Sequence, residues 1–558
     1  MASVDIPQPG AIASRAPAAV SEARWLHYAA GTVVYLVASA LTRPVFLGDT
    51  MYYLRTAHPG ATEFWDFGHL IWRPLLWILL QQFSAAERSA KFLLAFHALD
   101  FASTVAGLVT VWLTIATIRL FTCRVGAIIG TAIVMSFSQV VLTYSKGGCT
   151  YIFGLLALTA GLYILLRGAN REQSVRYDWV VCAALLALSV SLWLPYVLAI
   201  PGVLISPLLF SEARRRPGRL VIGVALVTGL VTAIAYAAVA MHLGICDLHG
   251  FAAWEASSSH AVTISGAKRV VFGFARSFLS TGENGSTFKR YLLHDPYNPV
   301  SLRQVFGVTL WRVMAFYVFL ASVLASALRS SLGRSAGLAF LVGSLPVLAF
   351  AVAWQGTDLE RYLPLYPSLM LVIGLAFSRA RLRSTTGCII GTFIAMLVVA
   401  NVLAFSAWSR ERQLREVTGT MRSLNALLPS ESLVLLPPMH PLQRIYWDFP
   451  EALPLAEHQL KLERIVDLGT ADTPRWRTLV ASDIRSRWEK ETPVVIDSSL
   501  LQDKPVANSS WVEGDDPRVH WRDIHAFVSK LEVGPRVGDT NFFAIPATKQ
   551  NISTIDGF

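Results

Sequence analysis

Long apolar segments, separated by short polar connections, recur along the chain between residues 25 and 408. Most approach the length of about 20 residues that a helix needs to cross the hydrocarbon core of a bilayer. The segment 179–210 is too long for one crossing and contains Pro195, so we expect two short spans that meet near this proline. The apolar segments are Trp25–Leu47, Lys91–Phe121, Val125–Tyr144, Tyr151–Leu166, Trp179–Phe210, Leu220–Leu243, Val305–Leu328, Ala336–Trp354, Tyr362–Phe377 and Gly387–Trp408. The pattern predicts an α-helical polytopic membrane protein with about 11 transmembrane helices.

Clusters of arginine give an independent test of this topology, because inner loops of membrane proteins carry an excess of basic residues. With the N-terminus inside, every short cluster falls on the inner side. These arginines are Arg119, Arg124, Arg167, Arg171, Arg176, Arg214, Arg215, Arg216, Arg219, Arg329, Arg334, Arg379, Arg381 and Arg383. Reading 179–210 as a single span would break the alternation. The alternation therefore places residues 48–90, 145–150, 244–304, 355–361 and the chain after Trp408 together on the outer side.

Composition supports the membrane assignment. Of the 558 residues, 54% are hydrophobic and 15% charged, and the mean hydropathy is +0.48. A soluble domain carries more charge. The formal net charge of +11 does not indicate nucleic acid binding, because the basic residues concentrate in short loops where they act as a topology signal. Arginine outnumbers lysine and alanine is abundant, which is typical of a GC-rich bacterial source and therefore of the bacterial cytoplasmic membrane.

Three regions follow from this pattern. Residues 1–24, rich in Ala, Pro and Ser, are expected to form a disordered cytoplasmic tail, and residues 25–408 the transmembrane domain. In the outer loops 48–90 and 244–304, apolar stretches too short to span predict interfacial helices. Residues 409–558 contain a helical pattern from Ser409 to Pro429 and short strand-like runs, which predict a small extracytoplasmic α/β domain. The runs are Leu433–Leu436, Val494–Asp497 and Phe542–Ile545.

The five cysteines show no spacing that is typical of a metal site. They are Cys123, Cys149, Cys182, Cys246 and Cys388. Cys149 and Cys246 both lie outside in the predicted topology, so they either form a disulfide or remain free.

Asp49 is the first candidate for chemistry. It follows the first span directly, where a membrane helix meets water and where a base facing a lipid-borne substrate would be needed. Its carboxylate is either a general base or a helix-end group that pairs with Arg43 or Arg73. The other acids of the loop, Glu63 and Asp66, either help to bind a metal or are solvated.

Four further residues of the same loop are candidates for substrate binding. His69 and Arg73 are four residues apart and share one face if the stretch is helical. Imidazole beside guanidinium suits an anion such as the phosphate of a lipid carrier, and the alternative is an arginine that reaches lipid headgroups from the interface. Tyr52 and Tyr53 follow Asp49 closely and are expected to contact substrate.

A second constellation lies between two late spans on the same side as Asp49. Arg361 and Tyr362 lead into a proline-containing apolar helix, which puts a fixed positive charge at the outer membrane surface. Arg361 is either a phosphate ligand or the partner of Asp358 or Glu360. Lys146, beside two glycines in another outer loop, is a further candidate phosphate ligand.

These motifs resemble the GT-C superfamily of integral-membrane glycosyltransferases, which includes protein O-mannosyltransferases and aminoarabinose transferases that modify lipid A. The shared features are an acid after the first span, His69 with Arg73-Pro74-Leu75 in the same loop, and Arg361-Tyr362-Leu363-Pro364 before a late span. The resemblance covers residues 25–408. It implies that Asp49 is the catalytic acid, that Arg361 contacts the donor phosphate, and that the donor is a polyprenyl-phosphate sugar. Many relatives carry two adjacent acids, whereas Asp49 is followed by Thr50, which leaves a bound divalent metal open.

The expected reaction is an inverting transfer to a hydroxyl of a lipid, glycan or protein acceptor on the outer face. Asp49 would take the hydroxyl proton, and Arg361 with Arg73 or Lys146 would stabilise the departing lipid phosphate without requiring a metal. One alternative is a transporter or flippase, which predicts charges within the spans; Asp100 is the clearest of these. The other is a lipid-linked oligosaccharide ligase or polymerase that uses outer-loop residues such as His260 and Arg276.

Overall fold

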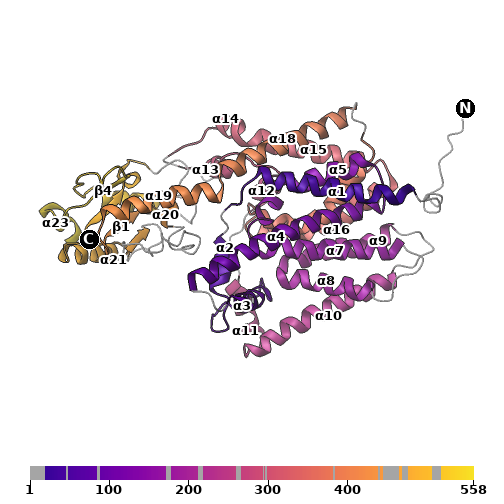
Figure 1. Ribbon diagram of the computed structural model, residues 1–558, viewed down its shortest axis with the longest axis horizontal. Helices are drawn as coiled ribbons and strands as arrows, with labels where there is room; N and C mark the ends of the chain where they lie inside the picture. The colour runs from indigo at the N-terminus through magenta and orange to yellow at the C-terminus, as the bar shows by residue number, and fades with distance from the viewer. Residues whose placement is uncertain are drawn as a thin grey trace, which may run out of the picture.

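Apolar helices make up most of the chain. In the computed structural model they form a bundle, and a smaller α/β unit lies at one end of it (Figure 1). The structure describes residues 19–45, 48–83, 88–170, 178–210, 218–258, 266–292, 294–295, 298–380, 384–437, 440–443, 464–467, 476–504 and 517–557. The first described helix, α1, begins at the end of the bundle opposite the α/β unit (Figure 1).

The helices of the bundle follow the apolar segments of the sequence. They are α1 (Ala19–Leu41), α2 (Gly48–Arg55), α3 (Trp72–Gln82), α4 (Arg88–Arg119), α5 (Val125–Phe137), α6 (Gln139–Tyr144), α7 (Thr150–Asn170), α8 (Asp178–Leu192), α9 (Ile200–Phe210), α10 (Gly218–His242), α11 (Leu248–Ser258), α12 (Gly266–Phe278), α13 (Ser286–Leu292), α14 (Leu302–Val305), α15 (Trp311–Ala327), α16 (Ser331–Ala353), α17 (Tyr366–Phe377) and α18 (Thr385–Ala407). Short 3-10 turns, Leu194–Ala199 and Leu359–Leu365, precede α9 and α17.

The structure confirms the prediction of a polytopic helical membrane protein. Within the described residues, 6 helices are long and apolar enough to cross a membrane, and 4 shorter apolar helices accompany them. The number of 11 spans stays a prediction. Most of the tail and several of the arginines used for the topology, among them Arg171, Arg176 and Arg214–Arg216, lie outside the described residues.

Two of the apolar segments are interrupted within their length. The expected break near Pro195 is confirmed: α8 ends at Leu192, Trp193 is extended with φ −156°, and a 3-10 turn precedes α9. A second break, which the sequence pattern did not indicate, separates α5 from α6 at Ser138. Helix breaks at membrane depth are tolerated where other groups bond the freed backbone polar groups.

Asn401 of α18 supplies such bonds at the second break. Its amide nitrogen donates to the carbonyl of Phe137, 2.6 Å, and to that of Phe278, 2.7 Å. Its side-chain oxygen accepts from the backbone N–H of Ser280 at 2.6 Å. The side chain is completely buried. One residue therefore bonds the free backbone groups at the ends of both α5 and α12.

The C-terminal unit is built around a sheet with the strand order β2-β1-β3-β4. β1 is parallel to both β2 and β3, and β4 is antiparallel to β3. Its elements are α19 (Arg410–Leu427), β1 (Leu433–Leu436), α20 (Pro441–Gln443), β2 (Arg464–Asp467), α21 (Trp476–Glu489), β3 (Val494–Asp497), α22 (Pro517–Val528), β4 (Phe542–Ala544) and α23 (Lys549–Asp556). The three predicted strand runs are present, and the polar segment of β2 was missed.

Arg410, at the start of α19, joins this unit to the bundle. Its guanidinium bonds the carboxylate of Asp100 in α4 at 2.7 Å and lies 4.7 Å from the ring centroid of Phe96. Its backbone N–H donates to the carbonyl of Pro44 at 2.7 Å. Asp100, the clearest charge within a predicted span, is therefore the counterion of the C-terminal unit.

All five cysteines are free thiols, with Cys149 buried and Cys246 exposed. The disulfide that the predicted topology allowed between these two residues is absent.

We expect Asn401→Leu to lower the free energy of unfolding by about 2 kcal/mol or more, because it leaves two carbonyls and one N–H buried without partners. Unfolding of the purified protein in detergent, followed by tryptophan fluorescence, measures the change. Ser406→Ala on the exposed side of the same helix is the control, since Ser406 bonds only the carbonyl of Val402 in its own helix. Equal stability of the two variants would contradict this role of Asn401.

Candidate active site

Asp49 lies in the first turn of α2, with its side chain exposed. The next residue, Thr50, is buried; its hydroxyl donates to the carbonyl of Gly147 and lies 3.0 Å from the sulfur of Cys149. Burial and the Asp49 carboxylate raise the pKa of Cys149, so this thiol stays neutral. The start of α2 is thus bonded to the loop between α6 and α7, and this contact fixes the position of Asp49, the residue before Thr50.

Two tyrosines connect Asp49 to a second carboxylate. The hydroxyl of Tyr151, in the first turn of α7, donates to Oδ2 of Asp49 at 3.3 Å. The hydroxyl of Tyr144, at the end of α6, donates to Oε2 of Glu360 at 2.5 Å. The two rings pack edge to face with their centroids 4.8 Å apart. The loop after the first span and the loop before α17 therefore meet at one site.

Arg361 lies next to this pair, in the 3-10 turn before α17. Its guanidinium lies 3.9 Å from the ring centroid of Trp354 and 5.7 Å from that of Trp193. Trp193 also packs edge to face on Tyr151, with centroids 5.1 Å apart. Arg361 is only 5% exposed, and aromatic faces stabilise a partly desolvated guanidinium.

Both sequence alternatives for the partner of Arg361 are realised. Its Nη2 lies 3.8 Å from Asp358 and 3.6 Å from Glu360, and it donates to the side chain of Gln355 at 3.0 Å. Its Nε is enclosed without a hydrogen-bond partner among the described residues. The guanidinium is therefore positioned by weak ion pairs that leave one buried donor unused.

Asp358 is a weaker acid than an ordinary carboxyl group. Burial and the neighbouring Glu360 raise its pKa to about 7, while Arg361 and Arg276 oppose the shift and Asp49 adds to it. Arg276, from α12, donates to the carbonyl of Thr357 at 3.3 Å and so borders the same loop. Asp358 is 38% exposed, and its charge changes near neutral pH.

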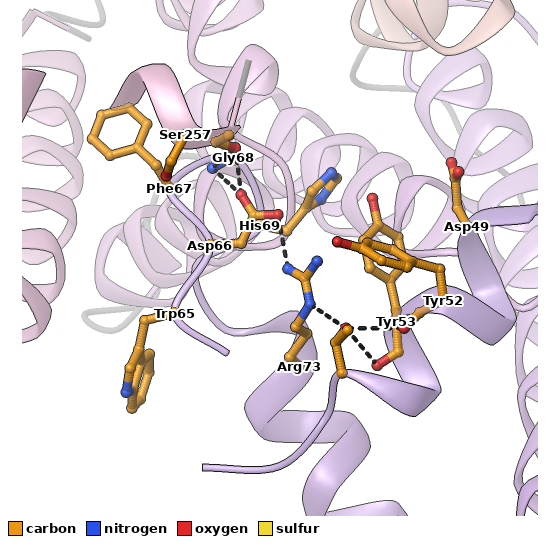
Figure 2. Close-up of polar contacts among 12 residues, drawn as sticks. Asp49, Tyr52, Tyr53, Trp65, Asp66, Phe67, Gly68, His69, Arg73 and Ser257 are labelled. Atoms are coloured by element: carbon orange, nitrogen blue, oxygen red, sulfur yellow. Dashed lines mark hydrogen bonds and ion pairs between the residues drawn. The ribbon is translucent and has the colours of Figure 1, made fainter. Parts of the chain in front are cut away.

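Arg73 is held inside the first outer loop rather than beside Asp49. Figure 2 shows its guanidinium joined to Asp66, with Asp49 apart from this pair. The distance to Asp66 is 2.8 Å, and Nε donates to the hydroxyl of Thr56 at 2.8 Å. The ring centroid of Tyr53 lies 4.8 Å away. At 1% exposure, Arg73 stabilises the loop and has no open face toward a ligand in this conformation.

His69 lies between the first loop and the tyrosine pair. Its ring centroid is 5.3 Å from that of Tyr53 and 5.7 Å from that of Tyr151. Burial lowers the pKa of His69, and the nearby Asp66 opposes this shift, so the ring is neutral at pH 7. Nδ1 lies 3.0 Å from the carbonyl of Leu192. Because a carbonyl only accepts, Nδ1 carries the proton and Nε2 is left as an acceptor.

Lys146 and Tyr362 are directed away from the site. The ammonium of Lys146 donates to the carbonyls of Ser39 and Thr42, at 2.7 and 2.9 Å, and to the hydroxyl of Thr42. Burial lowers its pKa to about 8, and the ammonium group bonds carbonyls that are left free at the end of α1. The hydroxyl of Tyr362 bonds the carbonyls of Val270 and Gly356.

Tyr52, in contrast, is 40% exposed and lies beside Arg73, with its ring centroid 5.5 Å from the guanidinium. Of the eight residues expected from the sequence, the structure brings Asp49, His69 and Arg361 to the tyrosine pair.

Roles for Tyr144, Tyr151 and Trp193 did not follow from the sequence, and Glu360 was expected only as an alternative partner of Arg361. Tyr144 and Tyr151 flank the short loop 145–150, so both were expected at the membrane edge. This position was the one sequence feature that could have indicated a role for them at the site. Trp193 directly precedes the break near Pro195. Its direction depends on the extended conformation at that position, which the sequence pattern does not specify.

The acids near Asp49 do not form a metal cluster in the part of the chain that the structure describes, where no group of three or more His, Cys, Asp or Glu side chains is arranged to hold a metal ion. Asp66 pairs with Arg73, and Glu63 is exposed. The polar contacts described at this site are therefore hydrogen bonds and ion pairs.

Gly273 of α12 allows the loop of Arg361 to approach closely. A Cβ atom at this position would overlap the carbonyl oxygen of Gly356 and lie 2.8 Å from the hydroxyl of Tyr362. We expect Gly273→Ala to displace residues 355–361 and to lower the free energy of unfolding by about 1–3 kcal/mol. Thermal unfolding measures the change. Gly223→Ala in α10, where a Cβ would meet nothing within 4 Å, should leave stability unchanged or higher, and equal behaviour of the two variants would contradict the close packing.

Comparison with known proteins gives a structural likeness only. No family model and no curated protein matches the sequence. The crystal structure of ArnT from Cupriavidus metallidurans in the apo state aligns with a TM-score of 0.49 and 11% identity, over 96% of this chain and 99% of that one. The structure of the same protein bound to undecaprenyl phosphate aligns with a TM-score of 0.47 and 11% identity, over 94% and 98%. At 11% identity and TM-scores below 0.5, this likeness carries no argument about the family or the role of any residue.

Proposed function

We propose that the protein is a membrane glycosyltransferase that moves a sugar from a polyprenyl-phosphate donor to an acceptor hydroxyl at the outer face of the membrane. One observation carries the proposal: the exposed Asp49 carboxylate accepts a hydrogen bond from Tyr151, and the Arg361 guanidinium lies over Trp193, which packs on the same tyrosine. A base and a fixed cation at the end of a helical bundle are the two groups that this transfer requires.

Asp49 acts as the general base. Its carboxylate is exposed, so an acceptor hydroxyl can reach it, and the hydrogen bond from Tyr151 orients it. The acceptor oxygen gives its proton to Asp49 and forms a bond to the anomeric carbon, while the bond from that carbon to the phosphate oxygen breaks. A single displacement of this kind inverts the anomeric configuration. The acceptor is a lipid, glycan or protein that presents a hydroxyl at the membrane surface.

Arg361 binds the lipid phosphate and stabilises the charge that it gains on leaving. Its enclosed Nε is an unused donor, and its aromatic surroundings strengthen electrostatic interactions by excluding water. Arg276 adds a second positive charge at the same loop. With these cations the proposed step is complete without a metal. Undecaprenyl phosphate, which ArnT binds in one of the two similar structures, belongs to the carrier class that we propose here.

The transporter alternative has less support. Asp100, the clearest charge that this alternative predicts within a span, forms an ion pair with Arg410 of the C-terminal unit. It therefore has a structural partner. The ligase or polymerase alternative relied on His260 and Arg276. His260 lies outside the described residues, and Arg276 contacts the loop of Arg361, where it serves the proposed transferase equally well.

The Asp49→Asn variant tests the base. We expect transfer from a polyprenyl-phosphate sugar by the purified protein to fall by about 10²–10⁴-fold, because the amide cannot accept the proton. Glu63→Gln, an exposed acid of the same loop, is the matched control and should keep full activity.

Thermal unfolding should show that Asp49→Asn is folded. Full activity in this variant would remove Asp49 as the base. Absence of transfer with any such donor in the unchanged protein, together with lipid movement in liposomes, would favour the transporter.

A dependence on pH follows from Asp358. Its carboxyl group is neutral below about pH 7 and anionic above it, and the added negative charge near Arg361 repels a phosphodiester. We therefore expect KM for the donor to rise between pH 6 and pH 8, by up to about tenfold. The donor phosphodiester itself keeps one charge over this range. In Asp358→Asn the rise should disappear, and an unchanged rise in that variant would assign the dependence to another group.

A further inference from the structure

Two buried side chains near Asp49 carry polar atoms without a hydrogen-bond partner among the described residues. His69 is 8% and Tyr53 is 4% exposed. Nδ1 of His69 lies 3.0 Å from the carbonyl of Leu192, whereas Nε2 and the hydroxyl of Tyr53 bond no described residue. Neither of these two atoms belongs to the side-chain atoms that are fully enclosed without a partner. Both therefore face open space beside the site.

The two side chains lie next to each other and close to Asp49. The ring centroids of His69 and Tyr53 are 5.3 Å apart, and His69 also packs edge to face on Tyr151 with the centroids 5.7 Å apart. Tyr151 donates to the Asp49 carboxylate. Figure 2 shows the ring of Tyr53 between His69 and Asp49. The two unused polar atoms thus border the space from which a substrate reaches the base.

The chemistry of these atoms fits a hydroxyl group better than a phosphate. Burial lowers the pKa of His69, so the ring is neutral and Nε2 accepts a hydrogen bond. Burial, followed by the Asp49 carboxylate, raises the pKa of Tyr53, so its hydroxyl stays protonated and donates. A hydroxyl group uses both, since it donates and accepts, whereas a phosphodiester offers Nε2 only acceptor oxygens. The neighbouring Arg73 is balanced by Asp66 at 2.8 Å and adds no net charge that favours an anion.

A row of aromatic side chains connects this pair to the cation that we propose for the phosphate. Arg361 lies over Trp193, Trp193 packs on Tyr151, and Tyr151 packs on His69. Arg361 is also close enough to act on the charge of His69, where it favours the neutral ring. His69 and Tyr53 are therefore the next free polar groups along the row from Arg361. A sugar attached to a phosphate at Arg361 extends toward them.

We propose that His69 and Tyr53 bind a hydroxyl of the sugar that the donor carries. Nε2 of His69 accepts from this hydroxyl and Tyr53 donates to it, while the phosphate lies at Arg361. The anomeric carbon, between the phosphate and the sugar ring, then faces the acceptor hydroxyl at Asp49. This role rests on the proposed glycosyltransferase activity and gives the site a means of distinguishing a glycosylated carrier from a sugar-free one.

His69→Asn and Tyr53→Phe test this role in the purified full-length protein. The amide nitrogen of asparagine can replace Nδ1 and donate to the Leu192 carbonyl, but the shorter side chain has no group at the position of Nε2. Tyr53→Phe removes only a hydroxyl that bonds no described residue. The donor is whichever of decaprenyl-phosphate mannose, glucose and arabinose the unchanged protein uses. We expect KM for it to rise about three- to tenfold in each variant, the effect of one lost hydrogen bond, with a smaller change in kcat.

Decaprenyl phosphate without a sugar separates this role from phosphate binding. Its inhibition constant against the same donor should stay unchanged in both variants and should rise in Arg361→Gln. Tyr163→Phe is the matched control, because it removes a tyrosine hydroxyl from α7 about 18 Å along the helix from Tyr151. This control should keep the KM of the unchanged protein.

An unchanged KM, or an equal rise of the inhibition constant for the sugar-free carrier, would overturn the assignment. A rise of KM for the acceptor alone would assign the pair to the acceptor and overturn it as well. Native mass spectrometry gives the same comparison without turnover: the preference for the glycosylated over the sugar-free carrier should fall in both variants. An unchanged preference rejects the role of the pair, whereas absence of transfer by the unchanged protein with all three donors contradicts the proposed activity.

Discussion

The arrangement of the loops around Asp49 depends on how the backbone groups freed at the end of α8 are bonded. The N–H of Ile71 donates to the carbonyl of Ser191, and the N–H of Leu194 donates to the carbonyl of Gly68. The carbonyl of Leu192 contacts Nδ1 of His69 and accepts from the hydroxyl of Thr150. Backbone groups without partners are costly in a membrane protein, and residues 68–71 of the loop after α2 bond those of this break.

This bonding explains why the site forms where it does. The hydrogen bonds between the first loop and the break place His69 beside Tyr151. The break also leaves Trp193 in an extended conformation, so that its ring packs on Tyr151 and lies near Arg361. The second break, at Ser138, is closed by Asn401. Interrupted helices thus provide both the local geometry and the polar groups of the candidate site, while the uninterrupted helices supply the apolar support.

The sequence alone predicted the membrane class, the helical segments, the break near Pro195 and three of the four described strands, because each depends on local hydrophobic pattern or on proline. It also brought Asp49 and Arg361 to the same side. It did not predict that Arg73 pairs with Asp66 or that Lys146 closes the end of α1, because a cation near a candidate site has several partners and the packing of distant segments selects one. The break at Ser138 and the polar strand β2 carried no distinct local signal.

The ion pair between Asp100 and Arg410 links the two parts of the molecule in their folding as well as in their position. Asp100 belongs to a helix of the bundle, yet its opposite charge is supplied from beyond the last apolar helix. Removing one partner of an enclosed pair leaves an uncompensated charge, which costs more than the pair contributes. The bundle and the C-terminal unit are therefore thermodynamically coupled, and a bundle expressed without the residues after Trp408 would contain the Asp100 carboxylate without its ion-pair partner.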